Sequence, residues 1–556
     1  MSRRAPAEGP PISRRAFLHG SFATTGLAAT TGLTSLGAAG CGPEPRPPPS
    51  DGWEAGDVLH LLPTASHDRI RLKASFRSQH PAPPRLVVGE KSSPGRASDG
   101  SGRFFSFDVG GLPPATAHRL QLRDGSGRAL CADWPLRTLP HPDASPESLR
   151  LLVFTCAGGP DNLYSLGFFE AFLPIALRQR LLARALSFAP DAVVANGDHV
   201  YWDLKSRFGW AMGRSPRAWW IAGLFDREQA VLGHANEQVL KRAFGPQIAG
   251  LYGTLLRSVP TFFLQDDHDY GENDEASEAL RTFPPDPFML DLARATQHLY
   301  YPELIASPGV PPARVGPGGL AESYGSFHWG RLFEALLYDC RRNLTNTLDP
   351  DLDHANSGFV PPDVERWLLD RTARSPALHL AHMPSTPLLW TAGKWGEWYP
   401  DSKDEQGVLR VDAGKPYWPD GWSAQHDRLV GAASARRDRT PLFASGDLHA
   451  LAAGTLHASN GRSLEANPVV SLLVGPISTG DLGWPSRFRG QVPQASGTVV
   501  ADEWLAPLEQ NGFSLLDFTP DELIVSLFAW HPDQGAEAID RLEPFRVIRI
   551  PRPPRA

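Results

Sequence analysis

The chain contains very little cysteine: four residues in 556, at positions 41, 131, 156 and 340. Cys41 closes an N-terminal segment that is rich in small residues, so three cysteines remain beyond it. An odd number of cysteines does not give a complete disulfide framework, and the fold must therefore rest on a packed core. At least one thiol is left over, which makes it a candidate metal ligand.

The chain also has fewer basic than acidic residues. The chain carries 54 lysines and arginines against 61 aspartates and glutamates, a formal net charge of −7. No basic excess therefore favours binding to nucleic acid or to an anionic membrane. Hydrophobic residues (41%) and charged residues (21%) occur at the frequencies of ordinary globular proteins. A chain of 556 residues exceeds one typical domain, so we expect two domains. We also expect the protein to be a monomer.

The N-terminal region lacks a hydrophobic run that could span a membrane. Its apolar stretch, SFATTGLAATTGLTSLGAAG (Ser21–Gly40), contains too many threonines, serines and glycines. Paired arginines precede it in SRRAFL (Ser13–Leu18), which is the layout of a twin-arginine export signal. Residues 1–41 are thus predicted to be a signal peptide for the twin-arginine export machinery, and residues 42–52 a proline-rich linker.

The end of this segment carries a second signal. Its last residues, LGAAGC, resemble a lipoprotein cleavage site before Cys41, although Ala38 stands where leucine is usual. We therefore expect the protein in the periplasm or at the cell surface, with Cys41 as a candidate lipid anchor.

Residues 53–140 have the pattern of a small β domain. In HDRIRLKASFRS, Ile70, Leu72 and Phe76 alternate with polar residues, as in a half-buried strand. Further short apolar runs follow, separated by turns rich in glycine, proline and serine. The segment FDVGGLPPATAHRLQLRDG resembles a fibronectin type III or immunoglobulin-like module. We expect a packing or positioning domain, joined by a linker at residues 141–148 to the rest of the chain.

From residue 149 to about residue 550, apolar strands alternate with amphipathic helices, which is typical of an α/β fold. Six apolar runs end on Asp, His or Cys: LRLLVFTC, PDAVVANGD, SVPTFFLQDD, LFEALLYDC, ALHLAH and PLFASGD. In sheet-based α/β enzymes, ligands bind beyond the carboxyl ends of the strands. Six strand ends that all carry donor side chains therefore predict one shared site.

Each motif has a simpler explanation when it is taken alone. A solvated acidic loop would account for DDHDYGEND (266–274), and a buried structural cysteine for Cys156. His382 in AHMP fits a core histidine as well as a ligand. SGDLH is the stronger signal, because Asp447 and His449 are alternate residues of an extended segment and point the same way. All the simpler explanations would have to hold at once, so we favour a metal centre.

The order of these motifs resembles the calcineurin-like metallophosphoesterase superfamily, through NGDHVY, QDDHDY, AHMP and SGDLH. Two departures narrow the match: Cys156 stands where the superfamily has an Asp-x-His motif, and Tyr201 follows Asp198 by three residues. These features resemble the alkaline phosphatase D family over about residues 53–527. The resemblance implies a four-layer metallophosphoesterase β-sandwich flanked by helices, at residues 149–550, preceded by the small all-β domain.

The resemblance also implies a centre that holds iron(III) and calcium. The implied ligands are Cys156, Asp198, Tyr201, Asp266, Asp267, Asn273, His382, Asp447 and His449. A thiolate and a phenolate suit trivalent iron, and Asp198 between them is placed to bridge to a second ion. Asp267 stands where the superfamily has asparagine, which adds a charged oxygen for a hard ion such as calcium. This family often lacks His382, so its role stays open. Asp266 and Asn273 are candidates because they lie close in the sequence to the other ligands, and their roles stay open too.

The implied reaction is hydrolysis of a phosphate monoester or diester by a metal-bridging hydroxide. His268 is expected to protonate the leaving oxygen, with Asp269 orienting it. Arg341 in LYDCRR is a candidate for holding a phosphate oxygen, or for a structural ion pair with Asp339. Two alternatives remain: a surface-anchored binding protein with a structural metal site, and a metal-dependent hydrolase of a non-phosphate substrate.

Two insertions rich in tryptophan and proline, GKWGEWYPDSKDEQ and KPYWPDGW, depart from the family pattern. Their aromatic side chains would suit a ring-bearing substrate or a hydrophobic contact between loops. We favour the contact between loops.

Overall fold

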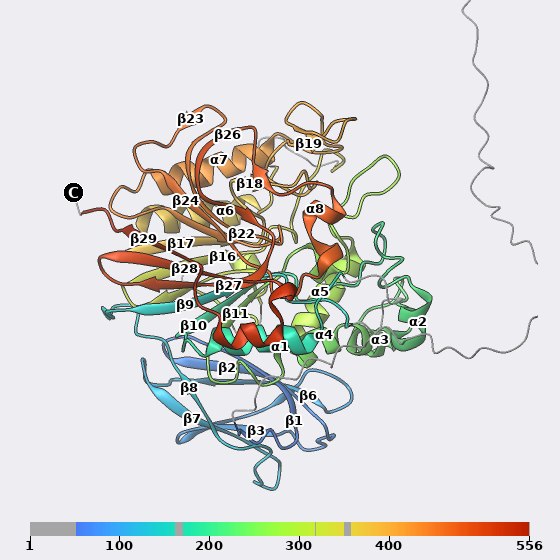
Figure 1. Ribbon diagram of the computed structural model, residues 1–556. Helices are drawn as coiled ribbons and strands as arrows, with labels where there is room; N and C mark the ends of the chain where they lie inside the picture. Colours follow the sequence, from blue (N-terminus) through green and yellow to red (C-terminus); the bar gives the residue numbers. More distant parts are fainter. Residues whose placement is uncertain (1–51, 162–170, 308, 317–318, 350–356, 555–556) are drawn as a thin grey trace, which may run out of the picture. The chain divides into compact units, whose positions relative to one another are not determined.

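The computed structural model describes residues 52–161, 171–307, 309–316, 319–349 and 357–554 (Figure 1). The predicted signal peptide with Cys41, and all but the last residue of the predicted linker, lie outside these residues. No helix within the described ranges combines the length and the apolar character needed to cross a membrane. The three cysteines of this part of the chain are buried free thiols.

Two four-stranded antiparallel sheets form the small N-terminal domain. The strand order of the first sheet is β1 (Val58–Ala65), β2 (Arg69–Phe76), β6 (Phe104–Gly110), β5 (Arg96–Ala97). The strand order of the second sheet is β4 (Lys91–Pro94), β3 (Arg85–Val88), β7 (Ala117–Arg123), β8 (Trp134–Arg137). The alternation predicted for β2 places Ile70, Leu72 and Phe76 in the core between the sheets. This region is all-β, as the sequence predicts.

The opposite face of β2 is not solvated, which differs from the half-buried pattern expected. Arg71 and Lys73 are buried, and their side-chain nitrogens lie 3.3 and 3.0 Å from the carboxylate of Glu303. Lys73 also donates to the carbonyl of His298 at 2.9 Å. The polar positions of this strand therefore meet charged and polar groups of the α/β domain, and they attach the small domain to it.

Two sheets form the centre of the α/β domain. The six-stranded sheet has the order β11 (Thr261–Leu264), β10 (Ala192–Asn196), β9 (Leu149–Phe154), β27 (Asn511–Phe518), β28 (Glu522–Trp530), β29 (Arg546–Pro551). The eight-stranded sheet has the order β15 (Tyr324–Trp329), β16 (Phe333–Tyr338), β17 (His379–Pro384), β21 (Leu442–Ser445), β24 (Val469–Val474), β22 (Leu451–Ser459), β23 (Arg462–Ser463), with β26 (Val499–Leu508) paired to β22.

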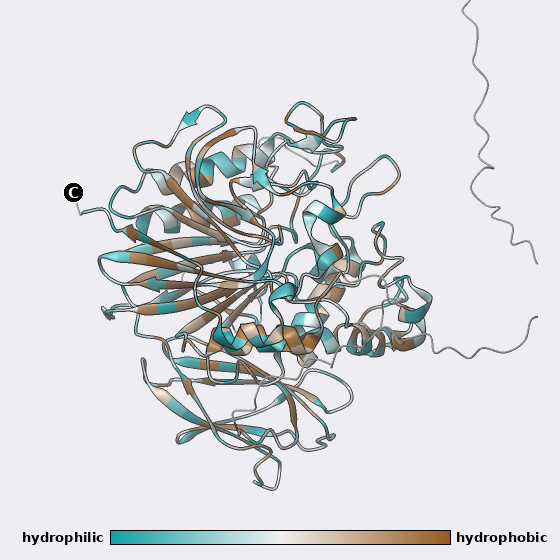
Figure 2. Ribbon diagram, in the orientation of Figure 1, coloured by the Kyte–Doolittle hydropathy of each residue, from teal (hydrophilic) through white to brown (hydrophobic). Residues whose placement is uncertain are grey.

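Strand residues alternate between the two faces of each sheet, and both faces are covered. In β9, Leu151 and Val153 face the core between the two sheets, whereas Leu152 and Phe154 face a layer of helices. Sheets that are covered on both faces need nearly continuous apolar strands, and Figure 2 shows the central strands mostly in brown.

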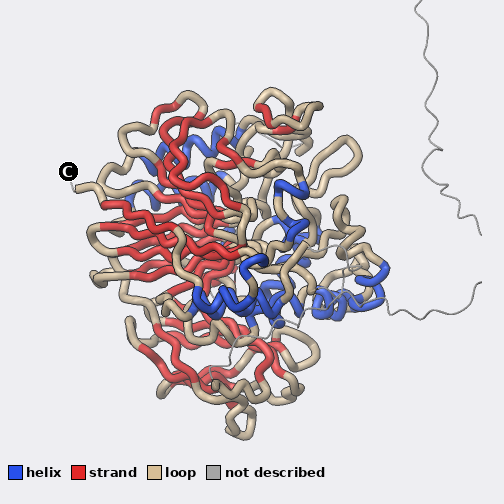
Figure 3. The backbone as a smooth tube through the Cα atoms, viewed as in Figure 1, coloured by secondary structure: helices blue, strands red, loops and turns tan. Residues whose placement is uncertain are grey.

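Helices cover the outer faces and complete four layers (Figures 1 and 3). The six-stranded sheet is covered by α1 (Ile175–Leu186), α3 (Ala235–Ala243), α4 (Gly245–Tyr252) and α5 (Pro287–Tyr300), the eight-stranded sheet by α6 (Pro362–Arg374) and α7 (Gly421–Ser434). Helix α1 is amphipathic, with Leu181 and Leu182 buried against the sheet. Asp286 caps α5 by accepting the N–H of Met289 at 3.0 Å. The predicted four-layer α/β fold is confirmed.

Short elements lie in the loops. They are α2 (Pro216–Ala222), α8 (Pro485–Phe488), the 3-10 helices η2 (Asp267–Tyr270), η3 (Pro312–Arg314), η5 (Asp481–Gly483), η6 (Pro532–Gln534) and η7 (Ala536–Arg541), and the strands β12 (Leu304–Ile305), β13 (Val315–Gly316), β14 (Leu320–Ala321), β18 (Trp390–Thr391), β19 (Ser402–Lys403), β20 (Leu409–Arg410) and β25 (Gln494–Ala495). Of these, η2, η5 and α8 contribute side chains to the cavity described below.

Candidate metal centre

The strand ends bring the predicted donors together. The strands β9, β10 and β11 are parallel neighbours, so their carboxyl ends lie at one edge of the sheet. Cys156, Asp198 and Asp266 each lie two residues beyond one of these strands, and Asp447 lies two residues beyond β21 of the other sheet. Side chains at the same position after four strands, two residues beyond the strand end, therefore meet at one site that both sheets supply.

Two glycines allow the loops to approach one another this closely. A Cβ on Gly197 would lie 2.7 Å from the Cβ of Asp266, and one on Gly446 would lie 2.0 Å from Oγ1 of Thr155. A side chain at either position would overlap its neighbour. Gly197 in NGD and Gly446 in SGD therefore allow the loops that carry the ligands to pack closely, in addition to forming the turns after the strands.

Several donors adopt a left-handed backbone conformation. The φ angles are 46° for Cys156, 58° for Asp198, 67° for Asp447 and 49° for His449. For residues other than glycine, such sparsely populated conformations cost on the order of 1–3 kcal/mol each. They persist where the surrounding structure holds them in place, and they cluster at functional sites.

The first donor group combines sulfur, nitrogen and oxygen. Ligand atoms of Cys156, Asp198 and His449 lie within 4.8 Å of one another. The hydroxyl of Tyr201 donates to Oδ2 of Asp198 at 2.8 Å and lies 3.1 Å from Nε2 of His449. The thiol of Cys156 donates to the same Oδ2 at 3.3 Å. A thiol, a phenol, an imidazole and a carboxylate thus converge on one point.

The protein alone keeps this thiol and phenol protonated. Burial and the Asp198 carboxylate raise the pKa of Cys156 and that of Tyr201 well above their ordinary values. Burial lowers the pKa of His449 to about 4, so its ring is neutral. Nδ1 of this ring donates to the carbonyl of Gly483 at 3.0 Å, which leaves Nε2 to act as a ligand. A cation at this point would favour the thiolate and the phenolate.

The second donor group consists of carboxylates. Oxygens of Asp198, Asp266, Asp267 and Asp447 lie within 4.8 Å of one another. Oδ1 of Asp198, Oδ2 of Asp266 and Oδ1 of Asp267 are buried and have no hydrogen-bond partner among the described residues. Buried carboxylate oxygens are costly unless a cation or a donor satisfies them. The residues therefore fit a metal ion, and Asp198, which belongs to both groups, can bridge two ions.

His268 lies beside the carboxylates, and Asp203 holds its ring. Nδ1 of His268 lies 2.8 Å from Oδ1 of Asp203. Burial alone would lower the pKa of His268, but the carboxylates of Asp203, Asp267 and Asp198 outweigh burial and raise this pKa to about 10. The imidazole is therefore charged at neutral pH, and it lines the cavity as a proton donor.

The expectation that Asp269 orients His268 is wrong. The two oxygens of Asp269 accept the backbone N–H groups of Asp198 at 2.9 Å, His199 at 2.8 Å and Asp266 at 2.9 Å. Adjacent residues of the 3-10 helix η2 point in different directions, so neighbours in the sequence do not share a partner. Asp269 instead fastens the loop after β10 to the loop after β11, and thereby positions Asp198 and Asp266.

Neither role predicted for Arg341 matches the structure. The guanidinium is fully buried and pairs with Asp266 at 2.6 Å, Asp274 at 2.8 Å and Asp447 at 3.0 Å. Asp339 accepts the backbone N–H of Arg341 at 2.7 Å and not its side chain. Because the guanidinium of Arg341 is already paired with carboxylates of the centre, it holds those carboxylates in position and is not directed at a phosphate.

Sequence reasoning missed three residues of the centre. Nζ of Lys394 lies 2.7 Å from Oδ2 of Asp267 and 3.2 Å from Oδ1 of Asp274. Asp274 belongs to DDHDYGEND and could have been named from that cluster. Asp203 follows Asp198 by five residues, on the same loop, whereas nothing in the surrounding insertion marks Lys394.

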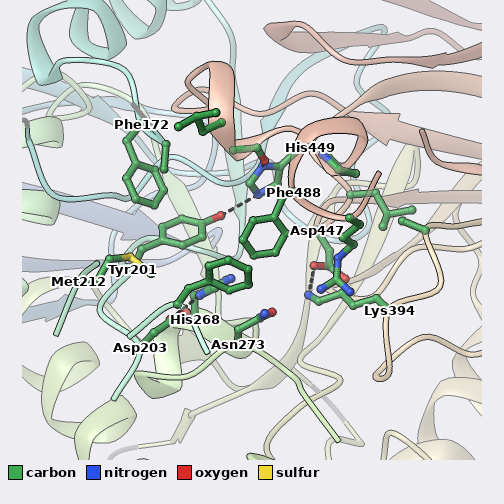
Figure 4. A pocket seen from close by; sticks show the side chains of 18 residues that line it. Phe172, Tyr201, Asp203, Met212, His268, Asn273, Lys394, Asp447, His449 and Phe488 are labelled. Carbon is green, nitrogen blue, oxygen red and sulfur yellow. Dashed lines mark hydrogen bonds and ion pairs between the residues drawn. The ribbon is translucent and has the colours of Figure 1, made fainter. Parts of the chain in front are cut away.

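Two predicted ligands lie outside both donor groups. His382 is buried within β17, and its Nε2 lies 2.9 Å from the hydroxyl of Thr372 on α6. Burial lowers the pKa of His382 to about 3, so the alternative of a core histidine holds and a ligand role does not. Asn273 lines the cavity close to His268 (Figure 4), and its amide donates to Glu275 at 3.2 Å.

The cavity above the donors has an apolar wall. This wall is formed by Phe172, Phe208, Met212, Leu448, Leu482 and Phe488, of which Figure 4 labels Phe172, Met212 and Phe488. The rings of Phe208 and Phe488 come from different loops and have their centroids 3.6 Å apart. A cavity lined by both polar groups and apolar side chains suits a ligand that has a charged group and an apolar organic part.

The tryptophans of the two insertions do not belong to this wall. Trp395, Trp398 and Trp422 are buried, and the rings of Trp395 and Trp422 have their centroids 5.2 Å apart. Trp398 packs on Phe359. The predicted contact between loops is confirmed.

Comparison with known proteins agrees with this geometry. The family model of PhoD-like phosphatases matches residues 151–527. A solved structure titled "Structure of PhoD" superposes with a TM-score of 0.56 at 13% identity, over 85% of this chain and 86% of that chain. Purple acid phosphatase PPD1 from yellow lupin (Lupinus luteus) seeds superposes with a TM-score of 0.51 at 12% identity, over 89% of this chain and 74% of that chain. Curated protein sequences give no significant match.

At these identities the structural likeness shows the fold, and the family model carries the activity. The matched segment contains both donor groups, His268 and the residues that brace them. The chain belongs to the PhoD-like phosphatase family and is a metal-dependent phosphoric ester hydrolase.

Proposed function

We propose that the protein is an exported phosphoesterase that cleaves phosphate monoesters or diesters with iron(III) and calcium at the Asp198 centre. The observation that carries this proposal is the membership of Asp198 in two donor groups of different chemistry. The group with Cys156, Tyr201 and His449 suits trivalent iron, and the group of carboxylates suits calcium. Bound cations would neutralise the charge of a phosphoester and lower the pKa of a bound water.

The side chains of the protein supply the proton and the geometry. The Asp203 carboxylate raises the pKa of His268 and favours its protonated form, and the ring faces the cavity, so it can protonate the leaving oxygen or stabilise the charge that develops there. Asp203 fixes the ring, because it accepts a hydrogen bond from Nδ1 and leaves Nε2 as the donor. The apolar wall at Phe208 and Phe488 receives the organic part of the ester.

Export rests on sequence evidence. The arginine pair in SRRAFL and the weakly apolar stretch behind it support passage through the twin-arginine route to the periplasm or the cell surface. Cys41 supports a lipid anchor. Replacing both Arg14 and Arg15 by lysine should leave the unprocessed protein inside the cell, as a fractionation blot would reveal.

Assays with aryl phosphate monoesters and diesters test the activity. The purified protein should release the aryl alcohol, lose activity after treatment with a chelator, and recover it with iron and calcium. Inorganic phosphate should inhibit, because a phosphoesterase site binds its product. A fully metal-loaded protein that cleaves neither ester and does not bind phosphate would favour a structural metal site or a hydrolase of another substrate.

A further inference from the structure

Lys394 is a buried lysine at the edge of the carboxylate group. It is 4% exposed, and its ammonium lies 2.7 Å from Oδ2 of Asp267 and 3.2 Å from Oδ1 of Asp274. It also contacts Oδ1 of Asp447. A lysine ammonium has three donors, and here three carboxylates surround it. One positive atom among oxygens of three carboxylates is the arrangement that a divalent ion would also seek.

The ammonium uses different oxygens from those that face the bridging residue. It pairs with Oδ2 of Asp267, whereas Oδ1 of Asp267, Oδ1 of Asp198 and Oδ2 of Asp266 lack hydrogen-bond partners in the described part of the chain. Lys394 and an ion beside Asp198 can therefore be present together. The ammonium also lies 3.2 Å from Oδ1 of Asp274, which does not belong to the group of four carboxylates that includes Asp198.

The surrounding negative charge stabilises the Lys394 ammonium in its buried position. Four buried carboxylates, Asp266, Asp267, Asp274 and Asp447, face each other across the group. Lys394 and Arg341 are the fixed cations that pair with them. A charged amine that left this position would abandon carboxylates that are out of contact with water, which is strongly unfavourable.

We propose that Lys394 is a built-in cation that holds one ion position of the centre, at Asp267, Asp274 and Asp447. The protein then needs metal ions at the Asp198 positions alone, and one positive charge of the site does not depend on metal supply. Lys394 acts as a positioning residue: it holds Oδ2 of Asp267, so that Oδ1 of Asp267 stays available to an ion beside Asp198, and it shares the Asp447 carboxylate with Arg341.

Counting ions tests the proposal without any need for turnover. Lys394→Met removes the charged ammonium and keeps the rest of the side chain. The three carboxylates then lack their cation and should recruit an ion in its place. After equilibration with calcium, the Met variant should hold one more calcium per chain by elemental analysis, or bind calcium at least about tenfold more tightly by calorimetry. Lys394→Arg keeps the charge and should hold the same number of ions as the unaltered protein.

Lys73 provides a matched control. It is 2% exposed, and its ammonium lies 3.0 Å from the carboxylate of Glu303, where the small domain meets the α/β domain. Lys73→Met should therefore leave the calcium count unchanged. If Lys394→Met binds calcium with the same number and affinity as the unaltered protein, the ammonium does not hold an ion position and the proposal is wrong.

A measurement on the unaltered protein avoids any failure of a variant to fold. Amine methylation followed by peptide mass spectrometry reports whether Lys394 is reactive, with the exposed Lys91 as a reference. Lys394 should stay unmodified both without metal and with saturating iron and calcium. If saturating metal makes Lys394 reactive, ions displace the ammonium and the proposal is overturned.

Discussion

The two donor groups that share Asp198 differ in their charge before a cation binds. On one side, Cys156 and Tyr201 are held as a protonated thiol and phenol, whose pKa values burial and Asp198 raise. On the other side, carboxylates already pair with Lys394 and Arg341. The thiol and phenol become anions only when a metal favours their ionised forms, whereas the protein itself partly neutralises the carboxylates. The two sides should therefore differ in how strongly they depend on metal.

Asp198→Asn should have the largest effect, because it breaks both sides at once. Asp198 belongs to each ligand group found in the described residues. We expect kcat/KM with an aryl phosphate to fall on the order of 10³-fold or more, with less iron and less calcium bound, since metal ions stabilise the charge of the transition state. Steady-state kinetics and elemental analysis on one sample measure both.

Asp517→Asn is the matched control for this variant. Asp517 lies on β27 and pairs with Arg150 at 2.7 Å, away from both donor groups. It should keep full metal content and activity. Full activity in Asp198→Asn would contradict a bridging role for Asp198.

Asp203→Asn should have an intermediate effect and should leave both metal sides intact. Without the carboxylate that orients His268, we expect kcat to fall about 10–100-fold with unchanged metal content. The Asp203 carboxylate raises the pKa of His268, so its loss lowers that pKa. The acid form is then lost at lower pH, and the alkaline limb of the kcat profile should move to lower pH. An unaltered limb would exclude His268 as the proton donor.

Phe488→Ala should have the smallest effect, because it changes the wall and neither donor group. The loss of apolar contact should raise KM for an aryl phosphate by less than about tenfold, with kcat unchanged. Glycerol phosphate, which has no apolar part, should be unaffected. Phe545→Ala, at a phenylalanine that is 45% exposed, is the control. An equal loss for both substrates would mean that Phe488 supports the loop and does not contact the ester.

The sequence predicted the donors that follow strands. Cys156, Asp198, Asp266 and Asp447 all lie two residues beyond an apolar run, and parallel strands bring such positions together whatever the details of the loops. His382 failed this test in a way that could have been foreseen. It lies inside β17 and not beyond it, so its side chain faces α6.

The residues that brace the centre were much harder to predict. Asp269 is adjacent to His268, yet its carboxylate turns back to backbone N–H groups. Arg341 and Lys394 reach their carboxylates across 53 or more residues of sequence. Such pairs depend on the path of loops that have no periodic pattern. Strand patterns thus locate a site, while loop geometry decides how its charges are balanced.

A visible absorption spectrum of the purified mature protein, with elemental analysis of the same sample, tests the central claim most directly. A phenolate bound to iron(III) gives a broad charge-transfer band, so the unaltered protein should be coloured and contain iron. The phenolate band should be lost in Tyr201→Phe, which leaves the thiolate-to-iron absorption that Cys156→Ser removes, while calcium on the carboxylate side stays bound. A colourless, iron-free protein obtained from cells with ample metal, or a spectrum that is unaltered in Tyr201→Phe and in Cys156→Ser, would contradict the assignment of Cys156, Asp198 and Tyr201 to iron.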